Sequence, residues 1–118
     1  MNEEKTLNNR EIIEDIPEVR KYIKDSRDAY LYCKYISNEY PEIINIITDS
    51  NYAYLYCRNV KDIEEMRAKI TESDDAYNYC LNVKDRKEIW SKITDPYWSS
   101  RYCTNVKNRI ELRKLITE

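Results

Sequence analysis

The sequence contains no glycine, no histidine and no phenylalanine among its 118 residues. Without glycine the chain cannot form the glycine-rich loops that cradle phosphate groups, which excludes that class of nucleotide site. Without histidine it lacks the commonest general base of enzymes and a frequent zinc ligand. No other set of residues departs from a structural role. We therefore expect no catalytic, cofactor-binding or metal-binding residues, and we expect that the protein is not an enzyme.

Long apolar runs and an excess of one charge are also missing. No stretch has the length and hydrophobicity of a signal peptide or of a membrane span, and the first residues, MNEEKTLNN, are polar. The 20 basic and 22 acidic residues give a net charge of -2, which supplies no general attraction to nucleic acid or to anionic lipid. We therefore expect a cytoplasmic protein with no membrane partner.

What the sequence does contain is a repeat with a period of 23 residues. The second copy reads ITDSNYAYLYCRNVKDIEEMRAK, and a half unit that matches only the later part of the repeat precedes the first copy. The four copies are 23–46, 47–69, 70–92 and 93–115. A fixed period of this length is typical of stacked helical hairpins. The sequence predicts an all-α fold, a short α-solenoid of about four hairpins preceded by one capping helix at 9–22, in a single domain over 1–118.

Each copy is predicted to contain a longer helix followed by a shorter one. In the second copy the longer helix is expected from Ser50 to Arg58 with Asp49 as its N-cap. The fourth copy supports this assignment, because Asp95 is followed by Pro96, which suits the first helical position. The shorter helix is expected to have about eight residues. Its closing residues are Ile23, Ile47, Ile70, Ile93 and Ile116.

Two recurring patterns suggest how these helices end and begin without glycine. Asparagine precedes valine at the end of the longer helix and is the best substitute for glycine in a left-handed C-cap. Aspartate or asparagine also stands three residues before a glutamate, the spacing of a capping box, which explains the repeated glutamate without a catalytic role. The asparagine and valine pairs are Asn59-Val60, Asn82-Val83 and Asn105-Val106. The predicted capping pairs are Asp15 with Glu18, Asp62 with Glu65, Asp85 with Glu88 and Asn108 with Glu111.

Four cysteines occupy the same position of the four copies. Neighbouring helices pack at roughly 10 Å, whereas a disulfide needs Cα atoms within about 7 Å, so we expect no bond between them. They share a face with small residues, Ala29, Ala53, Ala76 and Ser99. We predict that Cys33, Cys57, Cys80 and Cys103 are buried and reduced.

Twelve tyrosines and two tryptophans are the aromatic residues of the chain. Most of the tyrosines form two ladders, one of Tyr32, Tyr56, Tyr79 and Tyr102 and one of Tyr30, Tyr54 and Tyr77. One interpretation buries the rings between repeats and leaves the hydroxyl groups wet or hydrogen-bonded. The other makes the ladder a stacking platform for a single-stranded nucleic acid. The balanced charge argues against the platform.

Positions that vary between copies are better candidates for contact with a partner, since the fold does not dictate them. Two varied columns lie on the longer helix, one ending at Trp98 and one at Arg101, and a third lies on the shorter helix. All three contain aromatic or arginine side chains, the usual anchors of interfaces. The arginines also suit a solvated face near a helix C-terminus. The predicted partner-binding residues are Tyr52, Arg67, Trp90, Tyr97, Trp98 and Arg113.

The two ends of the predicted array differ. The half unit covers the first hairpin, whereas residues 116–118 only open a further unit and leave the last hairpin uncovered. We therefore expect binding to concentrate at this end, with a protein partner or with a second copy of the chain in a homodimer. The large side chains Trp90, Tyr97 and Trp98 lie near it in the sequence.

The repeat also resembles a known group of proteins. Ser50, Tyr54, Tyr56, Cys57 and Val60 follow the pattern S-x-x-Y-A-Y-x-Y-A/C-x-x-V, although Lys-Asp stands where Gly-Arg is usual. Over residues 23–118 the chain resembles the tyrosine-rich short hairpin repeats of uncharacterised phage and large DNA virus proteins, and more distantly tetratricopeptide and Sel1-like repeats. The resemblance implies no activity. It implies a small phage or viral inhibitor that binds and blocks a host defence protein in the host cytoplasm.

Two functions from different classes follow from the residues. The leading interpretation is a non-catalytic module that binds a protein. The alternative is a single-stranded nucleic-acid or nucleoprotein binder that uses the tyrosine ladder, and a steep dependence of binding on salt would favour it.

Overall fold

The computed structural model describes residues 17–116, which contain nine helices and no strand. Helices of ten residues alternate with helices of four residues. The long helices are α2 (Ser26–Tyr35), α4 (Ser50–Asn59), α6 (Ser73–Asn82) and α8 (Pro96–Asn105). The short helices are α1 (Pro17–Arg20), α3 (Pro41–Ile44), α5 (Glu64–Arg67), α7 (Lys87–Trp90) and α9 (Ile110–Arg113). The predicted all-α class is confirmed.

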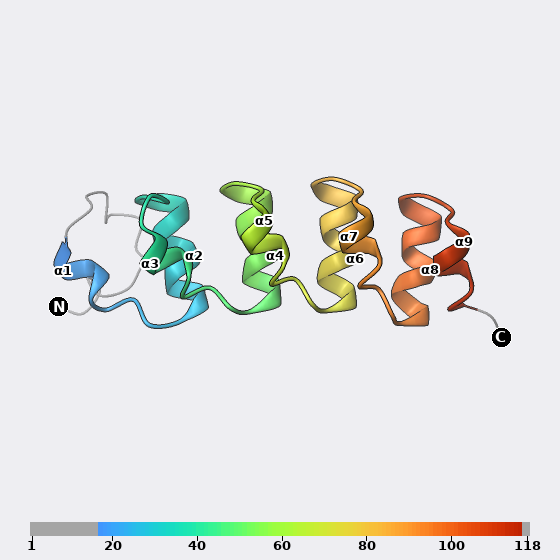
Figure 1. Ribbon diagram of the computed structural model, residues 1–118, viewed down its shortest axis with the longest axis horizontal. Helices are drawn as coiled ribbons and strands as arrows, with labels where there is room; N and C mark the ends of the chain where they lie inside the picture. Colours follow the sequence, from blue (N-terminus) through green and yellow to red (C-terminus); the bar gives the residue numbers. More distant parts are fainter. Residues whose placement is uncertain (1–16, 117–118) are drawn as a thin grey trace.

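The long helices stand side by side in chain order and form a row (Figure 1). Each long helix packs against the next, and α3, α5, α7 and α9 each pack back on the long helix before them. We call the pairs α2–α3, α4–α5, α6–α7 and α8–α9 the first to fourth units. The molecule measures 55 × 23 × 18 Å along its principal axes. Of the predicted capping helix 9–22, the structure shows α1, whereas residues 9–16, including Asp15, lie outside the described residues.

The long helices begin where the sequence predicts. The carboxylates of Asp49 and Asp95 accept the backbone N–H groups of Tyr52 and Trp98, each at 3.1 Å. An aspartate at this position satisfies one of the amide groups that the first helical turn leaves without a partner. Both predicted N-caps are therefore confirmed, and α4 ends at Asn59, one residue beyond its predicted end.

The predicted left-handed C-caps are wrong. No residue in the described range has a positive φ, and Asn59 is the last residue of α4 rather than its cap. Val60 follows with φ -117° and ψ -68°. The N–H groups of Val60 and Lys61 both donate to the carbonyl oxygen of Tyr56, at 2.8 and 3.0 Å. The chain thus leaves the helix through two hydrogen bonds to one oxygen, which requires no glycine.

The predicted capping boxes are wrong as well. α5 begins after Ile63 and α7 begins after Arg86, and no side chain caps either helix. The described short helices have four residues instead of the predicted eight. Asp62 and Asp85, the predicted caps, bond to side chains of the following unit. The spacing to glutamate was typical of a cap, but tyrosine and arginine side chains of the following unit bond to these carboxylates instead.

The core lies between each long helix and its short helix, and between one unit and the next. Its members include small residues and tyrosines of the long helices, the isoleucines that close the units and side chains of α3, α5, α7 and α9. They include Ala29, Ala53, Ala76, Ile23, Ile47, Ile70, Ile93, Ile43, Met66, Ile89 and Leu112, all buried. Helices of four residues do not form alone in water, so this shared core is what holds α3, α5, α7 and α9.

The four cysteines are free thiols. Cys33, Cys57 and Cys80 are buried as predicted, whereas Cys103 is half-buried, so the prediction is wrong for the fourth unit. Burial raises the pKa of the Cys33, Cys57 and Cys80 thiols to about 12. At neutral pH these groups remain protonated and are poor nucleophiles.

Substitutions of Asn82 can test whether this residue acts as a hydrogen-bond donor to the preceding unit or as a left-handed cap. Its Nδ2 donates to the Tyr54 hydroxyl at 2.8 Å, so Asn82→Ala should lower the free energy of unfolding by about 1 kcal/mol. Asn82→Gly should cost roughly a further 1 kcal/mol because the residue is helical. Urea unfolding followed by circular dichroism measures both variants. A glycine variant at least as stable as the alanine variant would instead support a left-handed cap.

Ser99 is a second position where the structure predicts a change of stability. It occupies the position of Ala53 and Ala76, is 0% exposed, and its hydroxyl oxygen has no hydrogen-bond partner in the described structure. Ser99→Ala should raise the free energy of unfolding by about 1 kcal/mol, because a buried hydroxyl without a partner is costly. The reverse change, Ala76→Ser, is the matched control and should lower it. Equal stability of wild type and Ser99→Ala would mean that the hydroxyl is satisfied.

Candidate protein-binding surface

Both tyrosine ladders lie inside the row. Seven tyrosines of the described range have buried side chains, and the four of the first ladder are at most 1% exposed. The buried tyrosines are Tyr30, Tyr32, Tyr54, Tyr56, Tyr77, Tyr79 and Tyr102. The interpretation of the ladders as buried rings is confirmed. Burial also removes the ring faces on which nucleobases would stack.

The hydroxyl groups of the second ladder accept hydrogen bonds from the following unit. The side-chain amide nitrogen of an asparagine donates to each of them at 2.8 Å. The pairs are Asn59 with Tyr30, Asn82 with Tyr54 and Asn105 with Tyr77. This contact explains why asparagine recurs at the last position of α4, α6 and α8.

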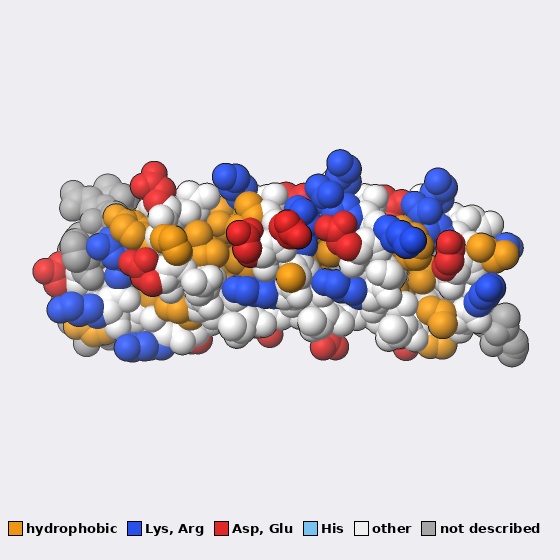
Figure 2. Space-filling view, in the orientation of Figure 1, with side chains coloured by type: hydrophobic (Ala, Val, Ile, Leu, Met, Phe, Trp, Pro, Cys, Tyr) orange, Lys and Arg blue, Asp and Glu red, His pale blue; other side chains and the backbone are white. Residues whose placement is uncertain are grey.

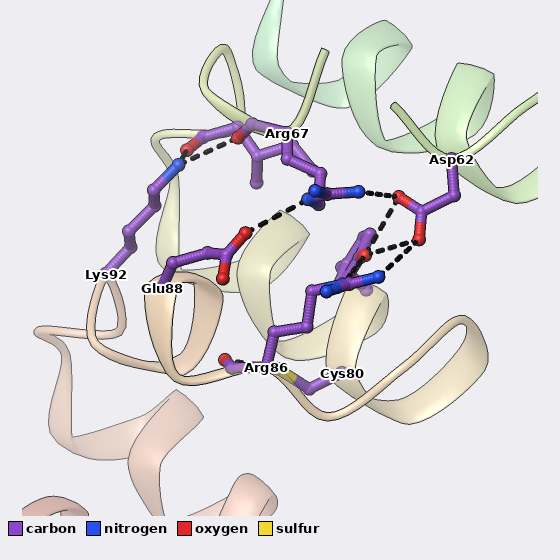
Figure 3. A network of polar contacts seen from close by, with 8 residues as sticks. Asp62, Arg67, Cys80, Arg86, Glu88 and Lys92 are labelled. Carbon is purple, nitrogen blue, oxygen red and sulfur yellow. Dashed lines mark hydrogen bonds and ion pairs between the residues drawn. The ribbon is translucent and has the colours of Figure 1, made fainter. Parts of the chain in front are cut away.

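The hydroxyl groups of the first ladder point to the preceding unit. Tyr79 donates to both carboxylate oxygens of Asp62, at 2.8 and 2.9 Å, and accepts from Nε of Arg86 at 2.8 Å (Figure 3). The same set recurs one unit later, where Tyr102 donates to Asp85 at 2.6 Å. Nε of Arg109 in turn donates to the Tyr102 hydroxyl at 2.6 Å. The earlier members are paired too, Tyr56 with Asn38 and Tyr32 with Arg20.

These contacts fix the charge of the carboxylates. Burial by itself would raise the pKa of Asp62, but hydrogen bonds from Tyr79 and Arg67 and the charges of Arg67 and Arg86 lower it below its ordinary value. Burial and the neighbouring Asp62 raise the pKa of Tyr79 to about 12. At neutral pH the aspartate is therefore ionised and the phenol protonated. Neither group is poised for proton transfer.

Arg67, a predicted partner-binding residue, is held inside this network. Its guanidinium donates to Asp62 and to Glu88, each at 3.0 Å, and its side chain is 14% exposed. Lys92 donates to the carbonyl oxygens of Arg67 and Ile70 at 2.8 and 2.6 Å (Figure 3). Arg67 therefore joins the second and third units and offers little surface to a partner.

Trp90 and Tyr52, also predicted as contact residues, are largely covered. Trp90 is 6% exposed, and the Arg109 guanidinium lies over its ring, 4.8 Å from the ring centroid. The half-buried Tyr52 packs against Tyr30, with 5.7 Å between ring centroids. Trp90 is therefore not the exposed anchor that the sequence suggested.

The remaining aromatic residues form an exposed cluster on α8. Tyr97 is 58% exposed and meets Trp98 edge to face, with ring centroids 4.8 Å apart. Trp98 is half-buried and packs on Tyr77 at 5.5 Å. The guanidinium of the exposed Arg101 lies within 5.9 Å of the Tyr77, Tyr97 and Trp98 rings. We call Tyr97, Trp98 and Arg101 the aromatic patch.

Arg101 belongs to one of the varied columns but was not among the six predicted partner-binding residues. Its spacing of four residues after Tyr97 on one helix was the available signal, because such residues share a face. The equivalent positions of the second and third units hold Asn51 with Leu55 and Asp74 with Asn78. The patch is thus confined to the fourth unit.

Arg113 lies apart from the aromatic patch, on α9. It is exposed and lines an open hollow of about 440 Å³ with Ile110, Lys114 and Ile116. A hollow of about 500 Å³ in the equivalent place lies between α5 and α7 and is lined by charged residues of both signs, including Arg67 and Glu88. Of the six predicted residues, the structure therefore brings together Tyr97 and Trp98, while Tyr52, Arg67, Trp90 and Arg113 lie elsewhere.

The described surface has no concentration of one charge on the face shown in Figure 2. Lysine, arginine, aspartate and glutamate side chains lie together along the middle of the row, and hydrophobic side chains are visible nearer both ends. No group of three or more histidine, cysteine, aspartate or glutamate residues in the described part of the chain could hold a metal ion. None of the described helices has the length and hydrophobicity to cross a membrane.

Comparisons with known proteins do not assign the chain. No protein-family model, no curated protein and no solved structure matches it.

The ionised aspartates between units predict a dependence of stability on pH. The lowered pKa of Asp62 and Asp85 contributes stability above the unfolded value of about 3.9, and this contribution is lost as pH falls through the folded values. Wild type should therefore lose stability below about pH 4 more steeply than the double variant Asp62→Asn/Asp85→Asn. Asparagine fits this position, since Asn38 holds it in the first unit.

Unfolding by urea at a series of pH values measures the effect. The variant should be less stable than wild type at neutral pH, and the difference should shrink toward pH 3. Parallel curves for wild type and variant would show that the two carboxylates do not contribute through their charge.

Proposed function

We propose that this chain is a non-catalytic protein-binding module and that the aromatic patch of α8 is its contact surface. The observation that carries the proposal is Tyr97, whose side chain is 58% exposed although it is a large aromatic group stacked edge to face on Trp98. A contiguous exposed cluster of aromatic and arginine side chains is the usual composition of an interface hot spot.

The contacts that hold the aromatic patch in place support the same function. Trp98 rests on Tyr77, which the Asn105 side chain holds through its hydroxyl, so the rings are oriented by the third and fourth units together. A contact group that is already ordered loses little conformational entropy on binding. The exposed Tyr97 and Arg101 can then make contacts at little ordering cost.

A module of this kind acts by occupying its partner's surface. Asp62, Tyr79 and Asp85, whose pKa values are shifted by their surroundings, belong to contacts between units. The repeat resembles those of phage and viral proteins, and on this basis we propose that binding blocks a host protein in the cytoplasm. Nucleic acid is a weaker candidate, because both ladders are buried and the net charge is -2.

The test is affinity capture from cells that naturally contain the protein, followed by quantitative mass spectrometry. Wild type is compared with Tyr97→Ser/Arg101→Ser, which removes the exposed part of the patch and keeps the half-buried Trp98. Leu81→Ser is the matched control, since Leu81 is 45% exposed on the neighbouring helix α6. Circular dichroism should show the same helix content for all three proteins.

One or a few proteins should be retained by wild type and by the control, and retention should fall at least about tenfold with the patch variant, equivalent to about 1.4 kcal/mol. Equal retention by all three would show that the patch is not the contact surface. Material that nuclease releases from the resin would point to nucleic acid instead.

A further inference from the structure

The long helix of each of the first three units carries two recurring side chains that accept hydrogen bonds from the next unit. A serine at the first helical position accepts a backbone N–H of the following unit at 3.0 Å, and a tyrosine hydroxyl accepts from the asparagine described above. The serines are Ser26, Ser50 and Ser73, and the tyrosines are Tyr30, Tyr54 and Tyr77. Each of the second, third and fourth units therefore donates hydrogen bonds to a serine and a tyrosine of the unit before it.

The fourth unit lacks both acceptors. Pro96 stands at the serine position and has no side-chain acceptor, and Ser100 stands at the tyrosine position, where its short side chain cannot extend as far as a phenol. At the third contact Asn108 stands where the second and third units have Asp62 and Asp85, and it is the residue type that pairs with Tyr56 in the first unit. The outward side of the fourth unit is therefore not built to receive another unit of the same repeat, and a second copy of this chain would not find the usual contacts there.

The surface of α9 has changed in the same unit. Ile110 stands where the second and third units have Glu64 and Lys87, and it is 56% exposed. Lys114 stands where these units have Ala68 and Ser91. With Ile116, which is 38% exposed, Ile110 gives the hollow of about 440 Å³ an apolar floor beside two cationic side chains.

Arg113 has lost the carboxylates that its counterpart uses. In the second unit Arg67 pairs with Asp62 of its own unit and with Glu88 of the next, both at 3.0 Å. In the fourth unit Asn108 carries no charge, and within residues 17–116 Arg113 makes no ion pair. The position of Glu88 relative to Arg67 shows where a carboxylate from a partner would lie relative to Arg113.

We propose that the hollow on α9 binds an acidic segment of a partner protein, which places a carboxylate on Arg113 and an apolar side chain against Ile110 and Ile116. The proposal rests on the protein-binding part of the proposed function, not on the aromatic patch, and states the chemistry of the partner. It combines the paired contact seen at Arg67 with the exposed isoleucines of the same hollow. Opposite charges across an interface determine which partner is selected.

Panning of a library of random peptides displayed on phage tests this proposal with the full chain. The comparison protein is Ile110→Glu/Arg113→Glu, in which the first change restores the residue type of Glu64 and the second reverses the charge. The matched control is Lys107→Glu, an exposed lysine of the same unit outside the hollow. Wild type and control should enrich peptides that combine acidic and apolar residues, and the double variant should not.

A synthetic peptide with the enriched sequence should bind wild type at least about tenfold more tightly than its glutamine-for-glutamate version. Enrichment of peptides without an acidic bias, or equal binding of the acidic peptide by the double variant, would overturn the proposal. So would a dimer in sedimentation experiments that the double variant abolishes, because a second copy would then occupy the hollow.

The panning and the capture experiment separate the two proposals. Patch-dependent capture with no acidic peptides would leave the proposed function standing and overturn the role of the hollow. Acidic peptides bound at the hollow without patch-dependent capture would overturn the role of the aromatic patch alone.

Discussion

The hydrogen bond of a buried tyrosine hydroxyl to a neighbouring unit is the interaction on which the row depends. All seven buried tyrosines of the described range make such a contact, to asparagine, aspartate or arginine. A phenol contributes a large apolar ring to the core, but its hydroxyl is costly unless it has a partner. Because each partner comes from an adjacent unit or, for Tyr32, from α1, no unit is satisfied alone, which agrees with a core without phenylalanine.

This constraint also separates the structural residues from those available for binding. The recurring serine, tyrosine, asparagine and aspartate are committed to contacts between units, so partner selection falls to positions that vary. In the fourth unit the recurring acceptors are replaced by Pro96 and Ser100, and the exposed aromatic patch and the α9 hollow occur in that same unit. In the fourth unit the side chains that join repeat units are thus replaced, and surfaces of a different composition are exposed. Both proposals are based on this change.

The sequence was sufficient for the features that depend on local spacing and not for those that depend on partners in other units. The period predicted the all-α class, and Asp49 and Asp95 were recognised as N-caps because a cap and its helix are adjacent. Asn82 and Asp62 were misassigned, since a cap and a donor or acceptor for a neighbouring unit use the same residue types. Trp90 was expected at the surface because its cover, Arg109, lies in the next unit.

The most direct test of this account is the stability of tyrosine-to-phenylalanine variants, measured by urea unfolding at neutral pH. Tyr79→Phe should lower the free energy of unfolding by about 1–3 kcal/mol, because it removes the bond to Asp62 and leaves Arg86 with one acceptor fewer. Tyr97→Phe, at an exposed ring, should change it by less than about 0.5 kcal/mol. If Tyr79→Phe were as stable as wild type, the hydroxyl contacts would not be what holds the units together.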